Sequence, residues 1–600
     1  MNRISLHSLC LALVLPGLLL SAGPLHAATL NEISTLARAG AGDLALRLMD
    51  SAEPAYAENA EQWMQWERER IYILQSRDQW SVVAERLKTL PEGISPGFQR
   101  WAETQRAEAL LKLDDSDAAL SVLRGLLWAD GEQIGDDQLN HWRQLVIRAY
   151  LAGQDMGDAE TAVQRFRQDY PDQAGDWPEL QARIYLHRDQ PLAASQVLEK
   201  AGIAANQPIR LLADFKSASR TAGEIFKTAI HRAVTKDIND SLRRHYWAVA
   251  ALAAEGMGNT VARISALEHA LALKPLGPQD DGLFAVNANQ LWEAYKQYGQ
   301  QLGNDLQLVV GSDQAWFVAA SNRFDTEPVK ARALFAVVAM DSFNAEHRAV
   351  ADWQLASLLN QEKDGGTILE HLYLDSKRFA RPEAIPAQVR YILVEHVLDI
   401  PDIPLASRLM TGLDTPPPKA DPRAWQLRRA RVLILGGRYD EGVKALGELF
   451  ARPDKLVVDR VEQVLFDLQT VGRHEDALRF FGLLLQLDLP DQRRREILYW
   501  MGDSCAALKR YTQAAEFYLH SATLTDPFSM DQWAQTARYQ AAQALASAGL
   551  LADARHIYQG LLGATRDASR QAVLRHKIQE LLLLKDERAR NARDRSSGGS

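Results

Sequence analysis

The 600-residue chain contains almost no cysteine, and this scarcity excludes a disulfide framework. Its two cysteines are Cys10 and Cys505. Cys10 falls within an N-terminal segment that we expect to be removed, so the mature chain keeps Cys505 alone and has no internal disulfide. Stability must therefore come from packing. Hydrophobic residues make up 47% of the chain, which is enough to build cores and too much for wholesale disorder.

The chain also lacks an excess of positive charge. It has 68 Lys and Arg residues against 77 Asp and Glu residues, which gives a formal net charge of -9. A general nucleic-acid binder needs a strong basic surface, so we expect no nucleic-acid partner. The length also exceeds the roughly 250–300 residues at which a single core stops growing. The chain must therefore form several domains or an elongated array.

Sequence motifs that carry catalysis are missing as well. The chain has no HExxH, no Walker loop and no glycine-rich fingerprint after a strand. Cys505 falls between Met501 and Leu508 on the inner face of a predicted helix, which favours a small buried hydrophobe over a nucleophile. The histidines are scattered, and none is paired at helical spacing as a metal site requires. We therefore expect no enzyme activity, no metal and no cofactor.

One apolar run is long, and it lies at the N-terminus. "MNR" is followed by "ISLHSLCLALVLPGLLLSAG" and then by a small residue, Ala27. This is the layout of a secretory signal peptide over 1–27. The alternative is an uncleaved membrane anchor, but two prolines and a glycine interrupt the run, and a spanning helix needs about 20 apolar residues. We expect a periplasmic protein that contacts membranes only through its partners.

Four stretches near the C-terminus share one pattern. They are "GGRYDEGVKALGELF" from Gly436, "VGRHEDALRFFGLLL" from Val471, "LKRYTQAAEFYLHSA" from Leu508 and "AGLLADARHIYQGLL" from Ala548. Each has a turn residue (Gly437, Gly472, Lys509, Gly549), then a small residue (Gly442, Ala477, Ala514, Ala554), then a large apolar one (Leu446, Phe481, Tyr518, Tyr558). Glycine suits the end of a helix, and a small residue lets two helices approach closely. The pattern predicts consecutive helix pairs.

This pattern resembles the tetratricopeptide repeat, a helix–turn–helix unit of about 34 residues. The closest match is "YWMGDSCAALKRYTQAAEFYLHSATLTDP", and "GRHEDALRFFGLLLQLDLP" and "RISALEHALALKP" also match. The resemblance is good over 424–562 and looser over the rest of the mature chain. It implies an all-α solenoid of antiparallel helix pairs, whose first helices line a concave face that holds a peptide or a partner helix.

The N-terminal part carries the pattern less regularly. Val83, Ala119, Ala162 and Ala194 appear at the small position, with spacings of 36, 43 and 32 residues. This drift predicts degenerate repeats or plain helical hairpins. "LQLVV", at 306–310, is the one stretch that favours a short extended segment. We expect Ser312 to cap a helix that begins near Gln314.

The organisation that follows from composition has six parts. They are a signal peptide at 1–27, degenerate repeats at 28–275, irregular repeats at 276–414, a proline-rich junction at 415–422, C-terminal repeats at 423–584 and a disordered tail at 585–600. Prolines stiffen the junction and forbid helix there. The tail is predicted because the apolar period is lost.

The resemblance maps the family's groove positions onto seven residues of the C-terminal repeats. They are Arg431, Glu462, Gln469, Tyr499, Asp503, Tyr539 and Gln543. All are polar or aromatic and lie on predicted helices whose other face is apolar. The resemblance thus implies a non-catalytic scaffold for protein–protein interaction, whose partner is an envelope protein or a peptide segment.

A different class of function remains open because tryptophan is concentrated in the N-terminal third. The residues are Trp63, Trp66, Trp80, Trp101, Trp128, Trp142 and Trp177. Tryptophan is favoured at binding surfaces and on sugar-binding faces, but it also fills cores between helix pairs. The alternative is a cell-wall or exopolysaccharide factor that binds glycan there. Exposed tryptophans in an N-terminal cleft would favour it, whereas pockets in the C-terminal groove would favour the scaffold.

Overall fold

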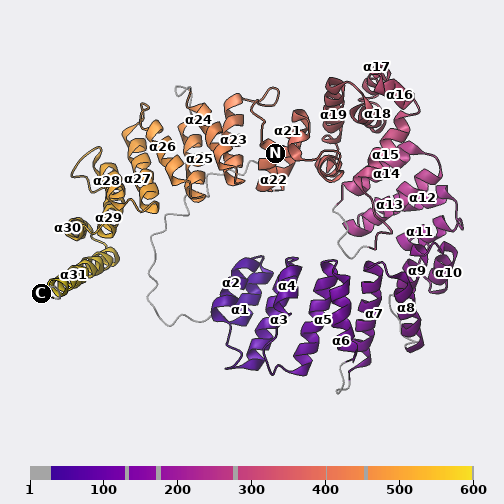
Figure 1. The fold of residues 1–600 in the computed structure, drawn as a ribbon, viewed down its shortest axis with the longest axis horizontal. Coiled ribbons are helices and arrows are strands. Elements are labelled where there is room, and N and C mark those ends of the chain that lie inside the picture. The colour runs from indigo at the N-terminus through magenta and orange to yellow at the C-terminus, as the bar shows by residue number, and fades with distance from the viewer. Residues whose placement is uncertain are drawn as a thin grey trace. The chain divides into compact units, whose positions relative to one another are not determined.

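The computed structural model describes residues 29–128, 134–169, 177–273, 281–400, 402–451 and 457–597. The predicted signal peptide lies outside these residues. Within them the chain is helical and contains no strand, so the all-α prediction is confirmed (Figure 1). None of the described helices combines the length and apolarity needed to span a bilayer. The chain divides into two compact units, Met1–Val286 and Asn287–Ser600.

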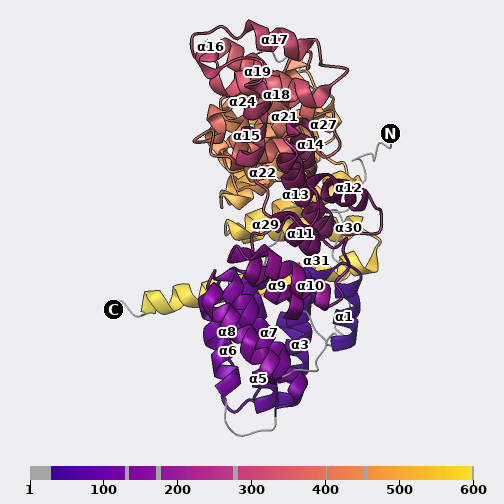
Figure 2. The ribbon, with the colours of Figure 1, turned by 90° about the vertical axis from the view of Figure 1, so that its right-hand side faces the viewer.

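The first unit contains fourteen described helices. They are α1 Leu30–Arg38, α2 Gly42–Ala52, α3 Ala60–Ser76, α4 Trp80–Arg86, α5 Pro96–Lys112, α6 Ser116–Trp128, α7 Asp136–Ala152, α8 Met156–Asp169, α9 Trp177–His187, α10 Pro191–Lys200, α11 Pro208–Lys216, α12 Ala222–Ala233, α13 Asp240–Gly256 and α14 Thr260–Leu271. Each packs mainly on the helices next to it in the chain, which is the contact pattern of stacked helix pairs (Figure 2).

The second unit begins with helices of uneven length. They are α15 Ala288–Gly299, α16 Asp305–Val309, α17 Gln314–Ser321, α18 Pro328–Asp341, α19 Ala345–Leu359, α20 Gly365–Glu370, the π-helical turn His371–Asp375, the 3₁₀ turn Pro382–Ala384, α21 Ala387–Asp399 and α22 Ile403–Met410. The proline-rich stretch forms the loop from α22 to the next helix. The Tyr391 hydroxyl on α21 donates to the carbonyl oxygen of Thr415 in this loop at 2.6 Å.

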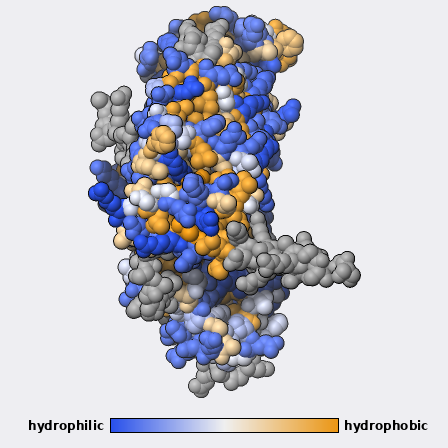
Figure 3. Space-filling model, turned by 90° about the vertical axis from the view of Figure 1, so that its left-hand side faces the viewer, coloured by the Kyte–Doolittle hydropathy of each residue, from blue (hydrophilic) through white to orange (hydrophobic). Residues whose placement is uncertain are grey.

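Regular pairs complete the second unit. They are α23 Pro422–Leu435, α24 Tyr439–Leu449, α25 Val458–Thr470, α26 His474–Leu484, α27 Asp491–Ala507, α28 Tyr511–Thr523, α29 Gln532–Ser547, α30 Leu551–Ala564 and the final helix α31 Ala568–Ser597. Apolar residues gather between hydrophilic ones on the surface that Figure 3 presents.

One turn geometry joins the two helices of ten pairs among the described residues. Its central residue has positive φ and is Gly40, Asp78, Asp114, Gln154, Asp189, Gly258, Gly437, Gly472, Lys509 or Gly549. The N–H of the following residue donates to the carbonyl five residues earlier, for example Arg438 to Leu433 at 2.8 Å and Asp115 to Leu110 at 3.0 Å. This is the Schellman cap, which satisfies a carbonyl at the helix end. The second helix begins two residues after the central residue.

Five places after nine of these turns, an alanine, valine or glycine packs against the first helix, and the sequence predicted all of them except Ala45 and Ala159. These residues are Ala45, Val83, Ala119, Ala159, Ala194, Gly442, Ala477, Ala514 and Ala554, and all are buried. At Gly442 an added Cβ would lie 2.7 Å from Ile434 Cγ1, so α24 approaches α23 too closely for a larger side chain. The large apolar positions, occupied by Leu446, Phe481, Tyr518 and Tyr558, are buried too.

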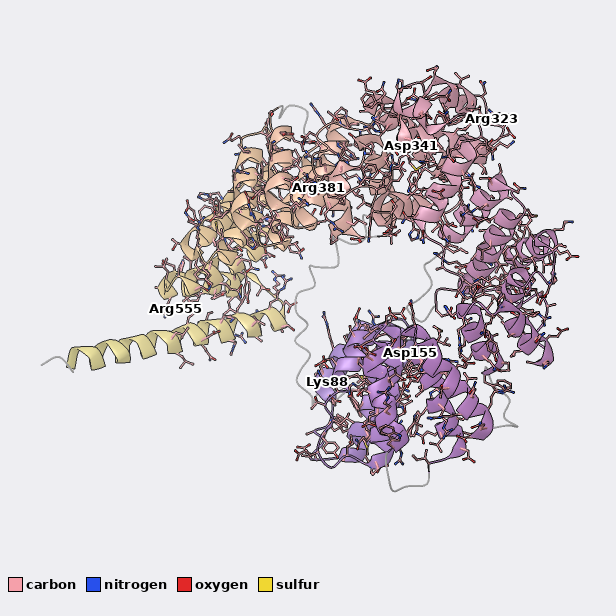
Figure 4. All side chains as sticks on the ribbon, turned by 45° about the vertical axis from the view of Figure 1, so that its right-hand side comes forward. Lys88, Asp155, Arg323, Asp341, Arg381 and Arg555 are labelled. Carbon is pink, nitrogen blue, oxygen red and sulfur yellow. The ribbon has the colours of Figure 1, made fainter. Side chains whose placement is uncertain are left out.

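One N-terminal assignment was wrong. Ala162 is only partly buried, and Ala159 takes the small position, because the turn residue is Gln154 (Asp155, next to it, is labelled in Figure 4). With Ala159 in place the N-terminal turns follow one another at 38, 36, 40 and 35 residues, from 40 to 78, 114, 154 and 189. These repeats are therefore more regular than their sequence indicated.

Three further expectations differ from the structure. The "LQLVV" segment is not extended but forms α16, because the Asn304 side chain accepts from the N–H of Gln307 and starts a helical turn. Ser312 does not cap α17. The N-cap is Asp313, whose carboxylate bonds Ser342 and His347 instead. Finally, α31 continues to Ser597 where a tail was predicted from 585, because Lys, Glu, Arg and Ala there favour helix even without an apolar face.

Candidate functional site

The seven predicted groove residues all lie on first helices of the C-terminal pairs. Arg431 lies on α23, Glu462 and Gln469 on α25, Tyr499 and Asp503 on α27, and Tyr539 and Gln543 on α29. Because first and second helices alternate along the chain, these residues lie on four consecutive first helices, as the resemblance implied. Most of their polar atoms, however, are already engaged by the next helix.

Arg431 and Glu462 form ion pairs between neighbouring first helices. Arg431 Nε lies 2.7 Å from Asp467 Oδ2, which joins α23 to α25. Glu462 Oε2 lies 2.8 Å from Arg493 Nη1, which joins α25 to α27. Burial, together with two neighbouring carboxylates, raises the pKa of Glu462 to about 7 despite Arg493. Both residues therefore hold repeats together rather than face a free groove.

Gln469 serves the same purpose through its amide. Its Nε2 donates to the Trp500 carbonyl at 2.8 Å and to Ser504 Oγ at 2.7 Å. Both acceptors lie on α27, and Ser504 is fully buried. The amide N–H groups of Gln469 are thus used inside the fold.

Tyr499 and Tyr539 are half-buried between helices. The ring of Tyr499 lies 5.2 Å from that of Trp500 and 5.3 Å from those of Tyr518 and Trp533, measured between centroids. Tyr539 packs on Tyr558 at 5.6 Å. Burial and the nearby Asp503 raise the pKa of Tyr499 to about 12. These rings therefore contribute to helix packing, and that limits their use as a binding surface.

Asp503 differs from Glu462, the other carboxylate of the set, because within the described residues no cation pairs with it. Its Oδ1 accepts a hydrogen bond from the Tyr518 hydroxyl at 2.5 Å, and that is its hydrogen bond within the described residues. Burial raises the pKa of Asp503 to about 6. At neutral pH it is still mostly ionised, so it is a charge without a counter-ion.

A pocket of about 490 Å³ opens between the last helices of the chain, and Tyr518, which bonds Asp503, is one of the residues that line it. Its walls come from α27 to α31: Ala506, Tyr511, Tyr518, Gln540, Gln543, Ala544, Ala546, Ser547, Tyr558, Lys577, Glu580, Leu581 and Leu584. Of the seven predicted residues, Gln543 lines it directly. The Tyr518 hydroxyl connects the wall to Asp503.

Sequence reasoning missed most of these walls. Tyr518 and Tyr558 were assigned to the apolar position of the repeat, where Leu446 and Phe481 stand in the preceding pairs. A hydroxyl at an otherwise apolar position was the signal that could have identified them. The contribution of α31 was missed because its sequence does not repeat the pair pattern.

The tryptophans of the first unit mostly fill spaces between helices. Trp66 and Trp142 are buried, and Trp142 Nε1 donates to Thr104 Oγ1 at 2.8 Å. Trp63 and Trp101 both pack on Phe98, with centroid distances of 5.9 and 5.0 Å. Trp80 and Trp177 are half-buried against basic side chains, Lys112 and Arg167. Trp128, at 79% exposure, is the one of the seven whose side chain faces solvent openly.

A second pocket, of about 530 Å³, lies in the first unit and contains no tryptophan. Its polar wall includes Glu179, Arg183 and His245, and Phe284 stacks on His245 with a centroid distance of 4.4 Å. Arg183 is engaged with Asp281 at 2.9 Å and with Glu179 at 3.0 Å. Burial and Arg183 lower the pKa of His245 to about 4, so its imidazole is neutral.

Two observations bear on metal binding and on cysteine reactivity in the described residues. Within them, no three His, Cys, Asp or Glu side chains converge as a metal site requires. Burial raises the pKa of the Cys505 thiol, which keeps it protonated at neutral pH. The arrangement of the C-terminal pocket suits recognition, with rigid aromatic walls and a few polar groups.

The repeated turns and buried small residues decide the class. The protein is an all-α helical-repeat solenoid. No family model matches the sequence, and no curated protein matches it. Among solved structures it matches a circular tandem repeat protein with novel repeat topology and enhanced subunit contact surfaces, at 13% identity over 88% of this chain and 98% of that chain, with a TM-score of 0.10. At that TM-score the match supports no further comparison.

Proposed function

We propose that this solenoid is an exported, non-catalytic scaffold of the tetratricopeptide type that binds a peptide segment of an envelope protein through its C-terminal repeats. The observation that carries the proposal is the pocket of about 490 Å³ between α27 and α31. Tyrosines such as Tyr511 and Tyr558 give it large rigid walls with hydroxyl groups, which suit the anchoring of a peptide. The first-helix face is also where the resemblance places a partner.

The lining of the pocket favours a peptide segment over a small cofactor. Its lining combines aromatic walls with exposed polar side chains, including Gln543 and Ser547 on α29. These side chains can bond the backbone of a peptide, whose amide groups need partners when they leave water. The glycan alternative has weaker support, because six of the seven N-terminal tryptophans are buried or half-buried among helices.

Export is the part of the proposal that rests on sequence alone. Mass spectrometry of the protein recovered from the periplasm should find Ala28 as its first residue, because small Ala27 precedes the predicted cleavage point. Recovery from a membrane fraction with Met1 retained would contradict a cleaved signal.

The binding face is tested by filling the pocket. A random dodecapeptide library is selected against the full mature chain, and the affinity of an enriched peptide is measured by fluorescence anisotropy. Gln543→Arg with Ser547→Arg adds two long cations to the α29 wall, where both native side chains are exposed. We expect this variant to bind the peptide at least about tenfold more weakly, which corresponds to roughly 1.4 kcal/mol.

The matched control places the same change on second helices. Gln513 on α28 and Gln559 on α30 are exposed and lie outside the pocket wall. Gln513→Arg with Gln559→Arg should leave the affinity unchanged. Equal weakening by both pairs, or no enriched peptide at all, would reject the C-terminal face as the binding surface. Tyr499 and Tyr539 are poor test positions, because their packed rings make a loss of binding inseparable from a loss of stability.

A further inference from the structure

The short helix α16 and the residue after it turn an apolar face to solvent. Leu306 is 73% exposed, Val309 54% and Val310 76%. These residues stand at positions i, i+3 and i+4, so their side chains share one side of the helical turn. Leu308 lies on the other side and is 1% exposed, so it anchors the segment to the fold. Three of the four apolar side chains of this segment are therefore left largely uncovered by the described residues.

Phe343 extends this apolar surface. It follows α18, and its N–H donates to the Leu308 carbonyl at 3.1 Å, so it lies beside α16. Phe343 is 76% exposed. We name Leu306, Val309, Val310 and Phe343 the α16 patch. In both ribbon views α16 lies at the upper edge of the second unit (Figure 1, Figure 2).

The segment that carries the α16 patch is fixed from below. The Asn304 side chain accepts from the N–H of Gln307 at 3.2 Å, which starts the helical turn. At Gly303 an added Cβ would lie 2.6 Å from Trp316 Cη2, so the chain before α16 packs closely on this ring. Trp316 is buried, and its Nε1 donates to the Gly299 carbonyl at 3.0 Å. The apolar side chains of the patch cannot turn inward, because the inner side is already filled.

The α16 patch has no dominant charge of either sign. From 302 to 312 the sequence contains one charged residue, Asp305. Beside Phe343, on α19, Glu346 and Arg348 have opposite charges, and Arg348 Nη1 donates to the Phe343 carbonyl at 3.0 Å. A charged partner is selected by complementary charges, which this surface does not offer. Two copies of the chain can meet here with little like-charge repulsion, although each has a formal net charge of -9.

The size of the α16 patch matches what a stable dimer needs. A fully exposed aliphatic side chain presents on the order of 100 Å² and a phenyl ring roughly 200 Å². With the exposed fractions given above, the patch offers roughly 350 Å² of apolar area. Two patches packed face to face would bury about 700 Å², and a homodimer interface that is about 65% apolar would then total about 1,100 Å². This total exceeds the roughly 1,000 Å² expected of a specific interface.

We propose that the α16 patch is covered by the same patch of a second copy of this chain, in a two-fold symmetric dimer. The same surface then serves on both copies, as in most homodimers. A lipid surface has less support, because the patch lacks the cluster of Lys and Arg residues that draws a protein to anionic headgroups. The pairing is independent of the C-terminal binding face, so the two proposals stand or fail separately.

The test measures the oligomeric state of the full mature chain by sedimentation velocity, from nanomolar to micromolar concentration. We expect a reversible dimer in the micromolar range. Val310→Glu places a carboxylate in the patch, where pairing would bury it without a counter-ion, and it should raise the dissociation constant at least about tenfold. The matched control is Val234→Glu after α12, where the native valine is 64% exposed, and it should leave the dimer unchanged. Thermal melts show that both variants are folded.

A mixing experiment tests whether the patch pairs with itself. Val310→Glu and Val310→Lys should each weaken the dimer, and a mixture of the two should associate at least about tenfold more tightly than either variant alone, because opposite charges then meet across the contact. A mixture no tighter than the single variants would overturn the symmetric pairing.

Two other results would overturn the dimer itself. One is a chain that stays monomeric throughout the concentration range, or a dimer that Val310→Glu leaves intact. The other is a monomer that floats with vesicles of phosphatidylethanolamine and phosphatidylglycerol unless Val310→Glu is present, which would assign the patch to a lipid surface. Neither result changes the expectation for peptides at the C-terminal pocket.

Discussion

The turns of the first unit and those of the C-terminal repeats have one geometry and different residues. Asp78, Asp114, Gln154 and Asp189 hold the left-handed position in four of the six such turns of the first unit, whereas glycine holds it in three of the four C-terminal turns. The left-handed conformation costs an ordinary L-residue about 1–2 kcal/mol, and aspartate tolerates it better than most. The comparison teaches that tertiary packing imposes the turn even where the local sequence does not favour it.

The residue after the turn also differs between the two regions. Asp115 and Asp155 occupy it in the first unit, and each carboxylate accepts from a backbone N–H of the second helix, at 3.1 and 3.3 Å. In the C-terminal repeats Arg438, Arg473 and Arg510 occupy it and pair with Glu441, Asp476 and Glu475. Side-chain caps thus support these two turns of the first unit, and ion pairs support these three turns of the C-terminal repeats.

The largest predicted effect tests whether the tryptophans of the first unit are core. Trp142→Ala should destabilise the protein by about 3–5 kcal/mol, because a fully buried ring and its bond to Thr104 are lost. Trp128→Ala, at the exposed position, should change stability by less than about 0.5 kcal/mol. Urea unfolding checks both. A small loss of stability in Trp142→Ala would instead favour a role of these rings in ligand binding.

The next effect compares equivalent helix contacts in the two regions. Ala119→Trp and Ala514→Trp should each cost about 1–3 kcal/mol, because both methyl groups are fully buried where two helices touch. In a repeat array the loss should be confined to nearby pairs. Hydrogen exchange followed by mass spectrometry locates it. Faster exchange spread over the whole chain would argue against a repeat array.

Two aspartates in neighbouring C-terminal helices should respond to neutralisation with opposite signs. Asp531 bonds Arg495 and caps α29, and these contacts hold its pKa well below the usual range. Asp531→Asn should therefore lose about 1 kcal/mol at pH 7, a loss that disappears as pH falls into the acid range where the carboxylate protonates.

Asp503→Asn should instead stabilise the protein at pH 7, by up to about 2 kcal/mol. The folded pKa of about 6 lies above that of the unfolded chain, so the native state prefers the proton. The stability that protonated Asp503 contributes is present below about pH 4 and is lost as pH rises through 6. The gain from Asn should accordingly vanish at pH 4. Melting curves at pH 4, 5, 6 and 7 measure both aspartates, and equal signs would refute the contrast between them.

The smallest effect concerns the turns themselves. Gly437→Ala should cost about 1 kcal/mol, because its φ of +83° is unfavourable for a residue with a Cβ. Asp114→Gly should change stability by less than about 0.5 kcal/mol, since relief at φ +62° is offset by the greater freedom of glycine in the unfolded chain. Chemical denaturation measures the loss of stability in Gly437→Ala. A cost at Asp114 as large as that at Gly437 would mean that the aspartate side chain itself holds the turn.

The helix pairs of the C-terminal repeats could be predicted because their signals are local. Gly437, Ala477 and Tyr558 stand at fixed distances from each turn, and the cap joins atoms five residues apart. The N-terminal turn at Gln154 escaped prediction, since nothing about glutamine favours positive φ. Its register was therefore placed three residues too late, at Ala162.

The candidate site could be predicted only in part. The first-helix positions of the repeat selected Gln543, which is exposed, and Asp503, which has no cation partner within the described residues. They also selected Glu462 and Gln469, whose polar atoms bond the next first helix. Whether a polar side chain is free depends on residues about 30 positions away, such as Arg493 and Ser504. No local pattern contains that information.

The sequence by itself determined that the chain forms helix pairs, where the C-terminal turns lie and which small residues let the helices touch, because these features depend on backbone hydrogen bonds and spacing within one repeat. The tertiary structure decided which polar groups are satisfied and which are left over. Packing supplied an arginine to Asp352 and to Glu462 and a histidine to Asp313, whereas Asp503 received the Tyr518 hydroxyl and no cation within the described residues. Such leftovers arise from the meeting of several helices, so they exist only once the repeats have stacked.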